Sequence, residues 1–213
     1  MSDIFREIDE ELRRDNLLKL WARYRWHIIG FVVLALLIAG GIVAWRDHQA
    51  SERRAEAARY AGALALARTG KEADATKLFA ALAQSGGGYG VLAAFEQAEL
   101  KAKAGDGKGA IAAYDSLAKS SDVSPEFRDL AVLLSVMHGL ADEEPKAAID
   151  RLQPLTANGN PWRASALELI AAAKLKASDR AGARDVYKQL ADDLSTPQQL
   201  RARAAEMTAA LAH

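Results

Sequence analysis

An uninterrupted apolar segment near the N-terminus is the feature that most limits how this chain can fold. Residues 28–45 carry no charged side chain, and most of them are apolar. At about 1.5 Å per residue, a helix of this length extends roughly 27 Å, which is close to the hydrocarbon thickness of a bilayer. A polar chain of 168 residues follows. The segment therefore predicts one transmembrane helix, residues 28–45, that anchors a large soluble domain.

Aromatic residues mark both ends of the predicted span. Trp21, Tyr24 and Trp26 precede it and Trp45 ends it, and such side chains favour the headgroup regions of a membrane. A cleavable signal peptide is one alternative, but its apolar region is usually shorter, and Arg46-Asp47-His48 stands where small cleavage-site residues are expected. A buried helix of a soluble protein is the other alternative. It is disfavoured because the rest of the chain supplies a core of its own.

Charges beside the span do not settle its orientation. Five basic residues lie within about fifteen positions on its N-terminal side and four on its C-terminal side. Long domains, however, cross a membrane largely regardless of their charge. We therefore expect residues 1–27 in the cytoplasm and residues 46–213 outside it, with a cytoplasm-facing scaffold as the alternative.

The N-terminal tail, residues 1–27, contains a short amphipathic pattern. Ile4, Ile8 and Leu12 recur at a spacing of four with Phe5 beside them, and charged residues fill the other positions. This pattern predicts a short amphipathic helix. The helix could lie on the membrane surface, dock a partner or be a solvated leader. Its acidic residues disfavour tight contact with anionic lipid.

Composition and charge indicate a helical protein that does not bind nucleic acid. Half of the residues are hydrophobic, and Gly and Pro gather between the periodic stretches instead of within them. The 28 basic and 28 acidic side chains balance, so the chain has no basic field to attract nucleic acid. The absence of cysteine excludes disulfides and thiol catalysis.

A small-x3-large-x2-Leu spacing recurs four times after the span. Its four alanines lie 35, 38 and 35 residues apart, close to the 34-residue period of tetratricopeptide repeats. A small or medium residue twelve positions earlier marks the partner helix of each unit. Small residues at both positions let two helix backbones approach closely, while the large residue fills the adjoining groove. The predicted repeat-packing residues are Ala63, Ala75, Ala98, Ala110, Ala148, Ala171 and Ala183, with Val136 at the partner position of the third unit.

Turn residues divide each unit into two helices. Gly70-Lys71, Gly105-Asp106 and Ser178-Asp179 stand at equivalent places in three units, with Asp142-Glu143 in the remaining one. Gly tolerates the left-handed conformation that often ends a helix, and Ser or Asp can cap the helix that follows.

Other breaks separate the units from one another. They lie at residues 85–88, 122–125 and 158–161, and Pro125 and Pro161 each suit a first helical turn. Ser195-Thr196-Pro197 then starts a last helix. The expected fold is all-α: a single N-terminal transmembrane helix followed by a tetratricopeptide-like α-solenoid of about four helix pairs plus a C-terminal capping helix. An irregular antiparallel bundle is the alternative.

The sequence shows no catalytic or metal-binding motif. The four histidines have no metal-ligand spacing, and His138 in its apolar stretch suits a packed or groove position. Residues 85–88 resemble a phosphate loop only superficially, because no strand precedes them and no Gly-Lys-Ser/Thr follows. We therefore expect no enzyme activity, no cofactor and no metal.

Helical repeats present an extended concave surface that binds protein segments. When the four units are aligned by this recurring spacing, the first helix of each unit is expected to line the groove. The candidate partner-binding residues are Tyr60, Phe95, Glu99, Leu133, Met137 and Glu168. The alternative is that Phe95 and Leu133 belong mostly to the core between repeats.

Several segments resemble the YfgM-like family of bacterial membrane proteins. These are the aromatic and basic residues before the span, Trp45-Arg46 at its end, Tyr89-Gly90-x-Leu92-Ala93 in the second unit and Gly182-Ala183-Arg184 in the fourth. Residues 4–12 look like the version found in alphaproteobacterial relatives. The resemblance covers almost the whole chain.

This resemblance implies a location and partners. Members of the YfgM-like family are ancillary subunits of the SecYEG translocon in the bacterial inner membrane, with the repeats in the periplasm. The chain would then associate with the Sec translocon and with periplasmic chaperones or emerging polypeptides. An assembly factor for another envelope complex, such as cytochrome maturation, would share this architecture and is the alternative.

Overall fold

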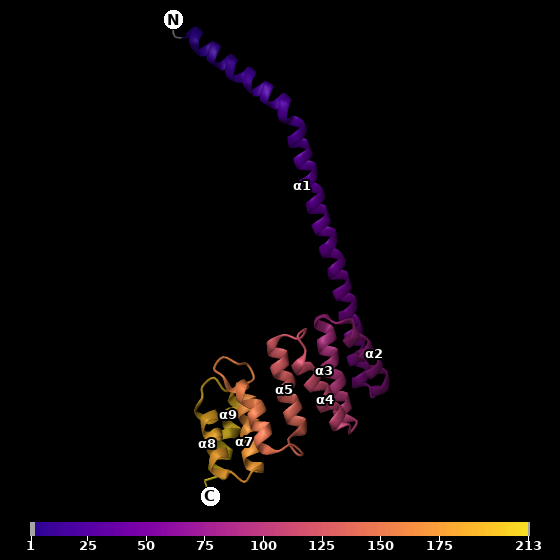
Figure 1. Ribbon diagram of the computed structural model, residues 1–213, viewed down its shortest axis with the longest axis vertical. Coiled ribbons are helices and arrows are strands. Elements are labelled where there is room, and N and C mark those ends of the chain that lie inside the picture. The colour runs from indigo at the N-terminus through magenta and orange to yellow at the C-terminus, as the bar shows by residue number, and fades with distance from the viewer. Residues whose placement is uncertain (1–2, 213) are drawn as a thin grey trace. The chain divides into compact units, whose positions relative to one another are not determined.

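The computed structural model is helical throughout the part of the chain that it describes (Figure 1). It describes the backbone of residues 3–212 and the side chains of residues 21, 23–27 and 29–212. Within that part the chain forms nine α-helices and one short 3-10 helix, and no strand. The chain divides into two compact units, Met1–Ala55 and Glu56–His213.

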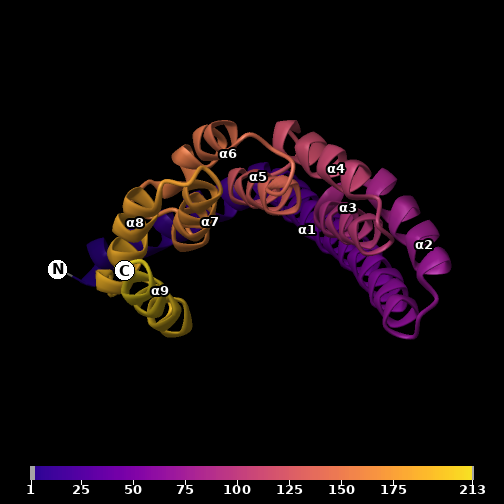
Figure 2. The ribbon, with the colours of Figure 1, turned by 90° about the horizontal axis from the view of Figure 1, so that it is seen from below.

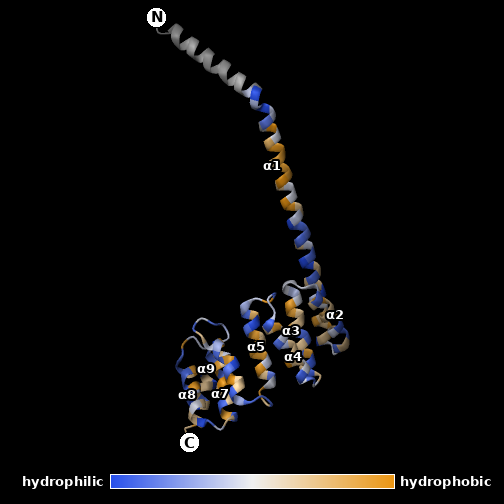
Figure 3. Cartoon of the chain, in the orientation of Figure 1, coloured by the Kyte–Doolittle hydropathy of each residue, from blue (hydrophilic) through white to orange (hydrophobic). Residues whose placement is uncertain are grey.

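The first unit is formed by α1, which spans Asp3–Arg68 and continues into the second unit. Its apolar stretch is drawn in orange in Figure 3, and none of that stretch is buried within the protein. Phe31, Leu36 and Leu37 are each about two thirds exposed or more, far more apolar surface than a soluble helix usually leaves uncovered. This helix is therefore long and apolar enough to cross a membrane.

The amphipathic segment of residues 4–12 belongs to α1 and is not a separate short helix. The side chains of Ile4, Phe5, Ile8 and Leu12 lie outside the described residues, as does the C-terminal His213.

The second unit is a curved stack of helix pairs. Figure 2 shows α3, α5, α7 and α9 in an inner row and α2, α4, α6 and α8 in an outer row. Residues 56–68 of α1 pair with α2, three further pairs follow, and α9 closes the stack. The solenoid of four helix pairs and a capping helix is confirmed. The helices are α2 Glu72–Ser85, α3 Gly87–Lys103, α4 Gly107–Lys119, α5 Pro125–Gly139, α6 Pro145–Leu152, η1 Gln153–Thr156, α7 Arg163–Lys176, α8 Arg180–Asp192 and α9 Gln198–Ala210.

Small residues are buried in the core that the helix pairs form. Each is fully buried, and all but Ala183 lie in the same core cluster as the large residue of their unit, whether Phe79, Tyr114, Leu152 or Tyr187. An alanine side chain lets the backbones approach, and the large side chain then fills the space beside it. The buried small residues are Ala63, Ala75, Ala98, Ala110, Ala148, Ala171 and Ala183.

The turns inside three units adopt the left-handed conformation. Gly70 has a φ of 78°, Gly105 a φ of 84° and Ser178 a φ of 64°. In two of these turns the following aspartate caps the next helix: Asp106 accepts a hydrogen bond from the Gly109 N–H, and Asp179 from the Gly182 N–H, at 2.9 Å each. The chain thus reverses direction at these turns, and the two aspartates give backbone N–H groups of the next helix a hydrogen-bond partner.

We expect Ser178→Gly to raise the free energy of unfolding by about 0.5–1 kcal/mol, because a side chain at positive φ is strained and glycine is not. The matched change Gly105→Ala should lower it by about 1 kcal/mol. A Cβ at Gly105 would meet nothing within 4 Å, so this loss would report backbone strain alone. Chemical unfolding followed by circular dichroism measures both, and equal signs for the two variants would contradict the interpretation.

The third helix pair, α5 and α6, departs from the others in its inner turn and after α6. Glu144 caps α6 by accepting a hydrogen bond from the Ala147 N–H at 2.8 Å, and η1 follows α6 without having been predicted. The expectation that Pro161 opens a helix was wrong, because α7 begins at Arg163. The Asn160 side chain accepts a hydrogen bond from the Trp162 N–H at 2.8 Å, and this turn delays the helix by two residues.

Candidate functional site

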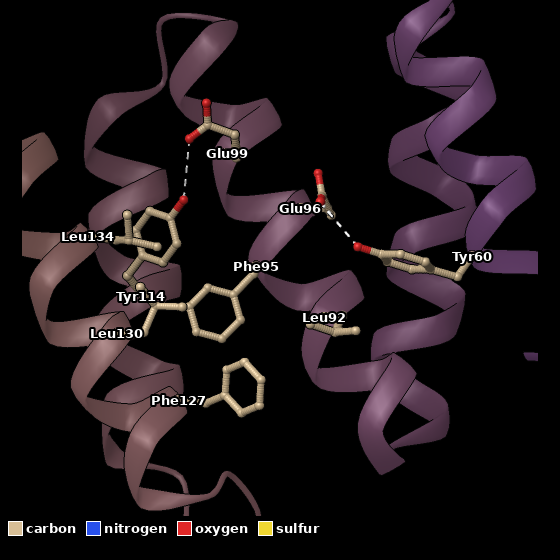
Figure 4. A pocket seen from close by; sticks show the side chains of 9 residues that line it. All are labelled: Tyr60, Leu92, Phe95, Glu96, Glu99, Tyr114, Phe127, Leu130 and Leu134. Carbon is tan, nitrogen blue, oxygen red and sulfur yellow. Dashed lines mark hydrogen bonds between the residues drawn. The ribbon is translucent and has the colours of Figure 1, made fainter. Parts of the chain in front are cut away.

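An open cleft of about 230 Å³ lies among α1, α3, α4 and α5, within the second compact unit (Figure 4). Most of its lining comes from inner-row helices, which are residues 56–68 of α1 together with α3 and α5. Tyr114 reaches it from α4 in the outer row. The lining residues are Tyr60, Leu92, Phe95, Glu96, Glu99, Tyr114, Phe127, Leu130 and Leu134.

One wall of the cleft is aromatic. The ring of Phe95 lies 6.0 Å from that of Tyr114 and 6.1 Å from that of Phe127, in tilted arrangements that aromatic pairs favour. Phe127 remains 38% exposed. Phe95 joins the buried core at its base, packing beside Ala98 and Tyr114. The wall is therefore held rigidly from behind and offers apolar surface in front.

Two tyrosine hydroxyls anchor two glutamates at the edge of the cleft. The Tyr60 O–H donates to Glu96 Oε1 at 3.2 Å, and the Tyr114 O–H donates to Glu99 Oε2 at 3.5 Å. Burial, with the neighbouring carboxylate as a second cause, raises the pKa of each tyrosine to about 12. Both hydroxyls therefore stay protonated near neutral pH and donate to the carboxylates.

The two glutamates differ in their surroundings. Glu99 lies 3.5 Å from Lys103 Nζ and 3.4 Å from His138 Nε2, and the His138 ring stacks on Tyr114 with centroids 5.6 Å apart. Among the side chains that the structure describes, no Lys, Arg or His nitrogen lies within 4.0 Å of Glu96. Its negative charge is therefore not balanced by a near neighbour.

Three of the six residues predicted to line a groove meet in this cleft. They are Tyr60, Phe95 and Glu99. Tyr60 also packs against Phe79 and Tyr89, with ring centroids 5.7 Å away in each case. Tyr60 thus belongs both to the core of the first helix pair and to the cleft.

The other three predicted residues lie elsewhere. Leu133 is only 7% exposed and belongs to the core around Val136 and Ile170. Met137 is 46% exposed but does not line the cleft. Glu168 forms an ion pair with Arg203, which joins α7 to α9.

Sequence reasoning missed much of the lining of the cleft. Leu92, Phe95, Glu96 and Glu99 follow one another at the i, i+3, i+4, i+7 spacing of a single helix face, so the pattern on α3 could have revealed Leu92 and Glu96. Tyr114 was taken only as a core marker. On α5 the cleft is lined by Phe127, Leu130 and Leu134, not by Leu133.

The chemistry of the cleft suits binding. Its groups are aromatic rings, leucines, two phenols and two carboxylates. In the described part of the chain, no three His, Asp or Glu side chains are grouped to hold a metal ion. Such a lining offers apolar contact and negative charge to a ligand.

A comparison with known families identifies this architecture. The tetratricopeptide repeat-like domain family matches residues 19–208. The chain belongs to this family. No curated protein matches the chain. Repeat domains of this kind are generally non-catalytic scaffolds that mediate protein–protein interactions, and the narrower likeness to the YfgM-like family stays a prediction.

Proposed function

We propose that this protein is a membrane-anchored adaptor whose cleft between α3 and α5 binds a segment of a partner protein. The observation that carries the proposal is the cleft itself: an open apolar wall beside two carboxylates, within a tetratricopeptide repeat-like stack. Its volume of about 230 Å³ is smaller than the roughly 300–1,000 Å³ usual for small-molecule sites. A cleft of this size suits one or two side chains of a polypeptide.

The proposal includes a location. Residues 1–27 would be a cytoplasmic tail, residues 28–45 would span the bacterial inner membrane, and residues 46–213 would form the periplasmic repeat domain. The exposed apolar stretch of α1 supports the span. The YfgM-like resemblance supports the rest, with the Sec translocon and periplasmic chaperones or emerging polypeptides as partners.

Protease added to cells with permeabilised outer membranes tests this orientation. We expect the repeat domain to be digested and the N-terminal tail to be protected. Protection of the repeat domain would contradict the periplasmic location and favour a cytoplasm-facing scaffold.

A photoreactive phenylalanine analogue at position 127 should crosslink a partner in intact cells, because Phe127 is exposed within the cleft. The matched control is the same analogue at position 194, since Leu194 is 88% exposed but lies outside the cleft lining. Mass spectrometry of the products identifies the partner. Sec subunits or periplasmic chaperones would support the translocon role, and cytochrome maturation proteins would replace it. The same products from both positions would contradict binding in the cleft.

Phe95→Ala should reduce the crosslinking yield from position 127 roughly tenfold, because truncating a central aromatic residue usually removes a large share of binding energy. Leu194→Ala should leave the yield unchanged. Circular dichroism checks that the Phe95 variant keeps its helices. A folded variant with full yield would show that the aromatic wall does not bind the partner.

A further inference from the structure

The charges around the cleft restrict the kind of ligand that it can bind. We infer that the cleft binds a polypeptide segment in which a Lys or Arg stands next to a large apolar side chain, and that Glu96 binds the cation. This inference rests on the proposed function, because it names the class of segment that the same cleft accepts.

The first argument is the absence of positive charge in the lining. None of the nine lining residues is Lys, Arg or His, and two of them are glutamates. An acidic segment or a C-terminal carboxylate would meet the carboxylate of Glu96, which no near cation among the described side chains balances, while Lys103 beside the cleft is already paired with Glu99. Like-charge juxtaposition of this kind opposes binding, so the cleft selects against acidic segments.

The second argument is the difference between the two glutamates. Glu99 already has Lys103 and His138 within 3.5 Å. Glu96 accepts a hydrogen bond from the Tyr60 O–H at 3.2 Å, and this contact orients its carboxylate without neutralising it. A carboxylate can accept several hydrogen bonds at once, so Glu96 keeps acceptor capacity for an ammonium or guanidinium group.

The third argument is the layout of polar and apolar groups. Figure 4 shows Glu96 and Glu99 along one edge of the cleft and Phe127 towards the opposite side, with Phe95 between. Lys and Arg carry an apolar stem with a charged head. The stem would lie against Leu92 and Phe95 while the head reaches Glu96. A neighbouring apolar side chain would then contact Phe127 and Leu130.

Peptide binding to the full-length protein tests the inference. The protein is placed in nanodiscs of zwitterionic phosphatidylcholine, so that a cationic probe is not attracted to the lipid. Three fluorescent ten-residue peptides share a Gly/Ser background and differ only at the centre: Leu-Lys-Phe, Leu-Gln-Phe or Leu-Glu-Phe. Fluorescence anisotropy at low salt gives the affinities, and empty nanodiscs give the background.

We expect the Lys peptide to bind roughly tenfold more tightly than the Gln peptide, since a hydrogen bond to a charged group contributes about that much. The Glu peptide should bind least. Glu96→Gln should bring the Lys and Gln peptides to within about twofold, because the amide can still accept from Tyr60 but carries no charge. Glu96→Lys should reverse the order of the Lys and Glu peptides.

The matched control is Glu206→Gln, which removes an exposed carboxylate of α9 outside the cleft and should leave all three affinities unchanged. Equal binding of the Lys and Gln peptides, or full affinity for the Lys peptide in the Glu96→Gln variant, would overturn the inference. Partner crosslinking from position 127 would still uphold the adaptor proposal in that case. Loss of both peptide binding and crosslinking would reject the adaptor proposal and the inference about its ligand together.

Discussion

Replacing Leu152 with Ala should lower the free energy of unfolding by about 2–5 kcal/mol, the range measured for truncating buried leucines. Leu152 is fully buried in the core cluster of the third unit, among residues of α5, α6 and α7 that include Val136 and Ile170. Removing three of its carbon atoms forfeits their transfer from water and leaves a cavity that a rigid helix stack fills only in part.

Chemical unfolding of the full-length protein in detergent micelles, followed by helical circular dichroism, measures the loss. Leu194→Ala is the matched control, because Leu194 is 88% exposed and should change the unfolding free energy by no more than about 0.5 kcal/mol. If the two variants unfolded alike, Leu152 would not be the large residue that completes its unit.

The position of Leu152 shows why the repeat could be predicted from the sequence. The small-x3-large-x2-Leu spacing describes contacts within one helix and with its immediate neighbour, and such contacts depend on side-chain volume at fixed helical spacing. Leucine fulfils the same requirement in the third unit as Phe79, Tyr114 and Tyr187 do in the others. The core of every unit could therefore be predicted even where the residue type departed from the usual aromatic.

The cleft was less predictable because it depends on how far a side chain reaches. Tyr60, Phe95 and Leu133 occupy equivalent places, each three residues before the small residue of its helix. Tyr60 and Phe95 pack against the core and still extend into the cleft. Leu133 is shorter and ends inside the core. Equivalent register therefore did not give equivalent exposure.

Charge balance could be predicted from the sequence only in part. Glu99 differs from Glu96 because it has two nearby basic groups. Lys103 lies one turn after Glu99 on the same helix, and His138 approaches Glu99 from α5. The first contact follows from helical spacing. The second requires the packing of α3 against the following unit, which no local pattern describes.

Arg151 joins two repeat units through a network that no sequence pattern indicated. Its Nη2 donates to Asp115 Oδ1 at 2.7 Å and to Ser135 Oγ at 2.8 Å, and its Nη1 donates to Glu143 Oε1 at 3.1 Å. The fully buried Ser135 in turn donates to Asp115 at 2.6 Å. One guanidinium of α6 thus bridges α4, α5 and the turn between α5 and α6.

Arg151→Met should lower the free energy of unfolding by about 1.5–3 kcal/mol, because it removes hydrogen bonds to charged groups and leaves two carboxylates without their cation. The loss falls below that of a fully buried pair, since the three charged side chains are 19–34% exposed. Lys188→Met is the matched control. It breaks an ion pair with Asp192 in which both side chains are 65% exposed, and should cost no more than about 0.5 kcal/mol.

A double-mutant cycle separates the network from lost packing. Asp115→Asn removes the charge that needs Arg151, so the double variant should lose at least about 1 kcal/mol less than the sum of the two single losses. Additive losses would show that Arg151 acts only through its apolar stem.

Helical repeats contact only their neighbours, so each junction between repeats must be stable in its own right. The Arg151 junction fixes α5 to α4, and α5 carries Phe127 and Leu130, which form one side of the cleft. Weakening this junction should therefore also lower peptide affinity, even though Arg151 does not line the cleft.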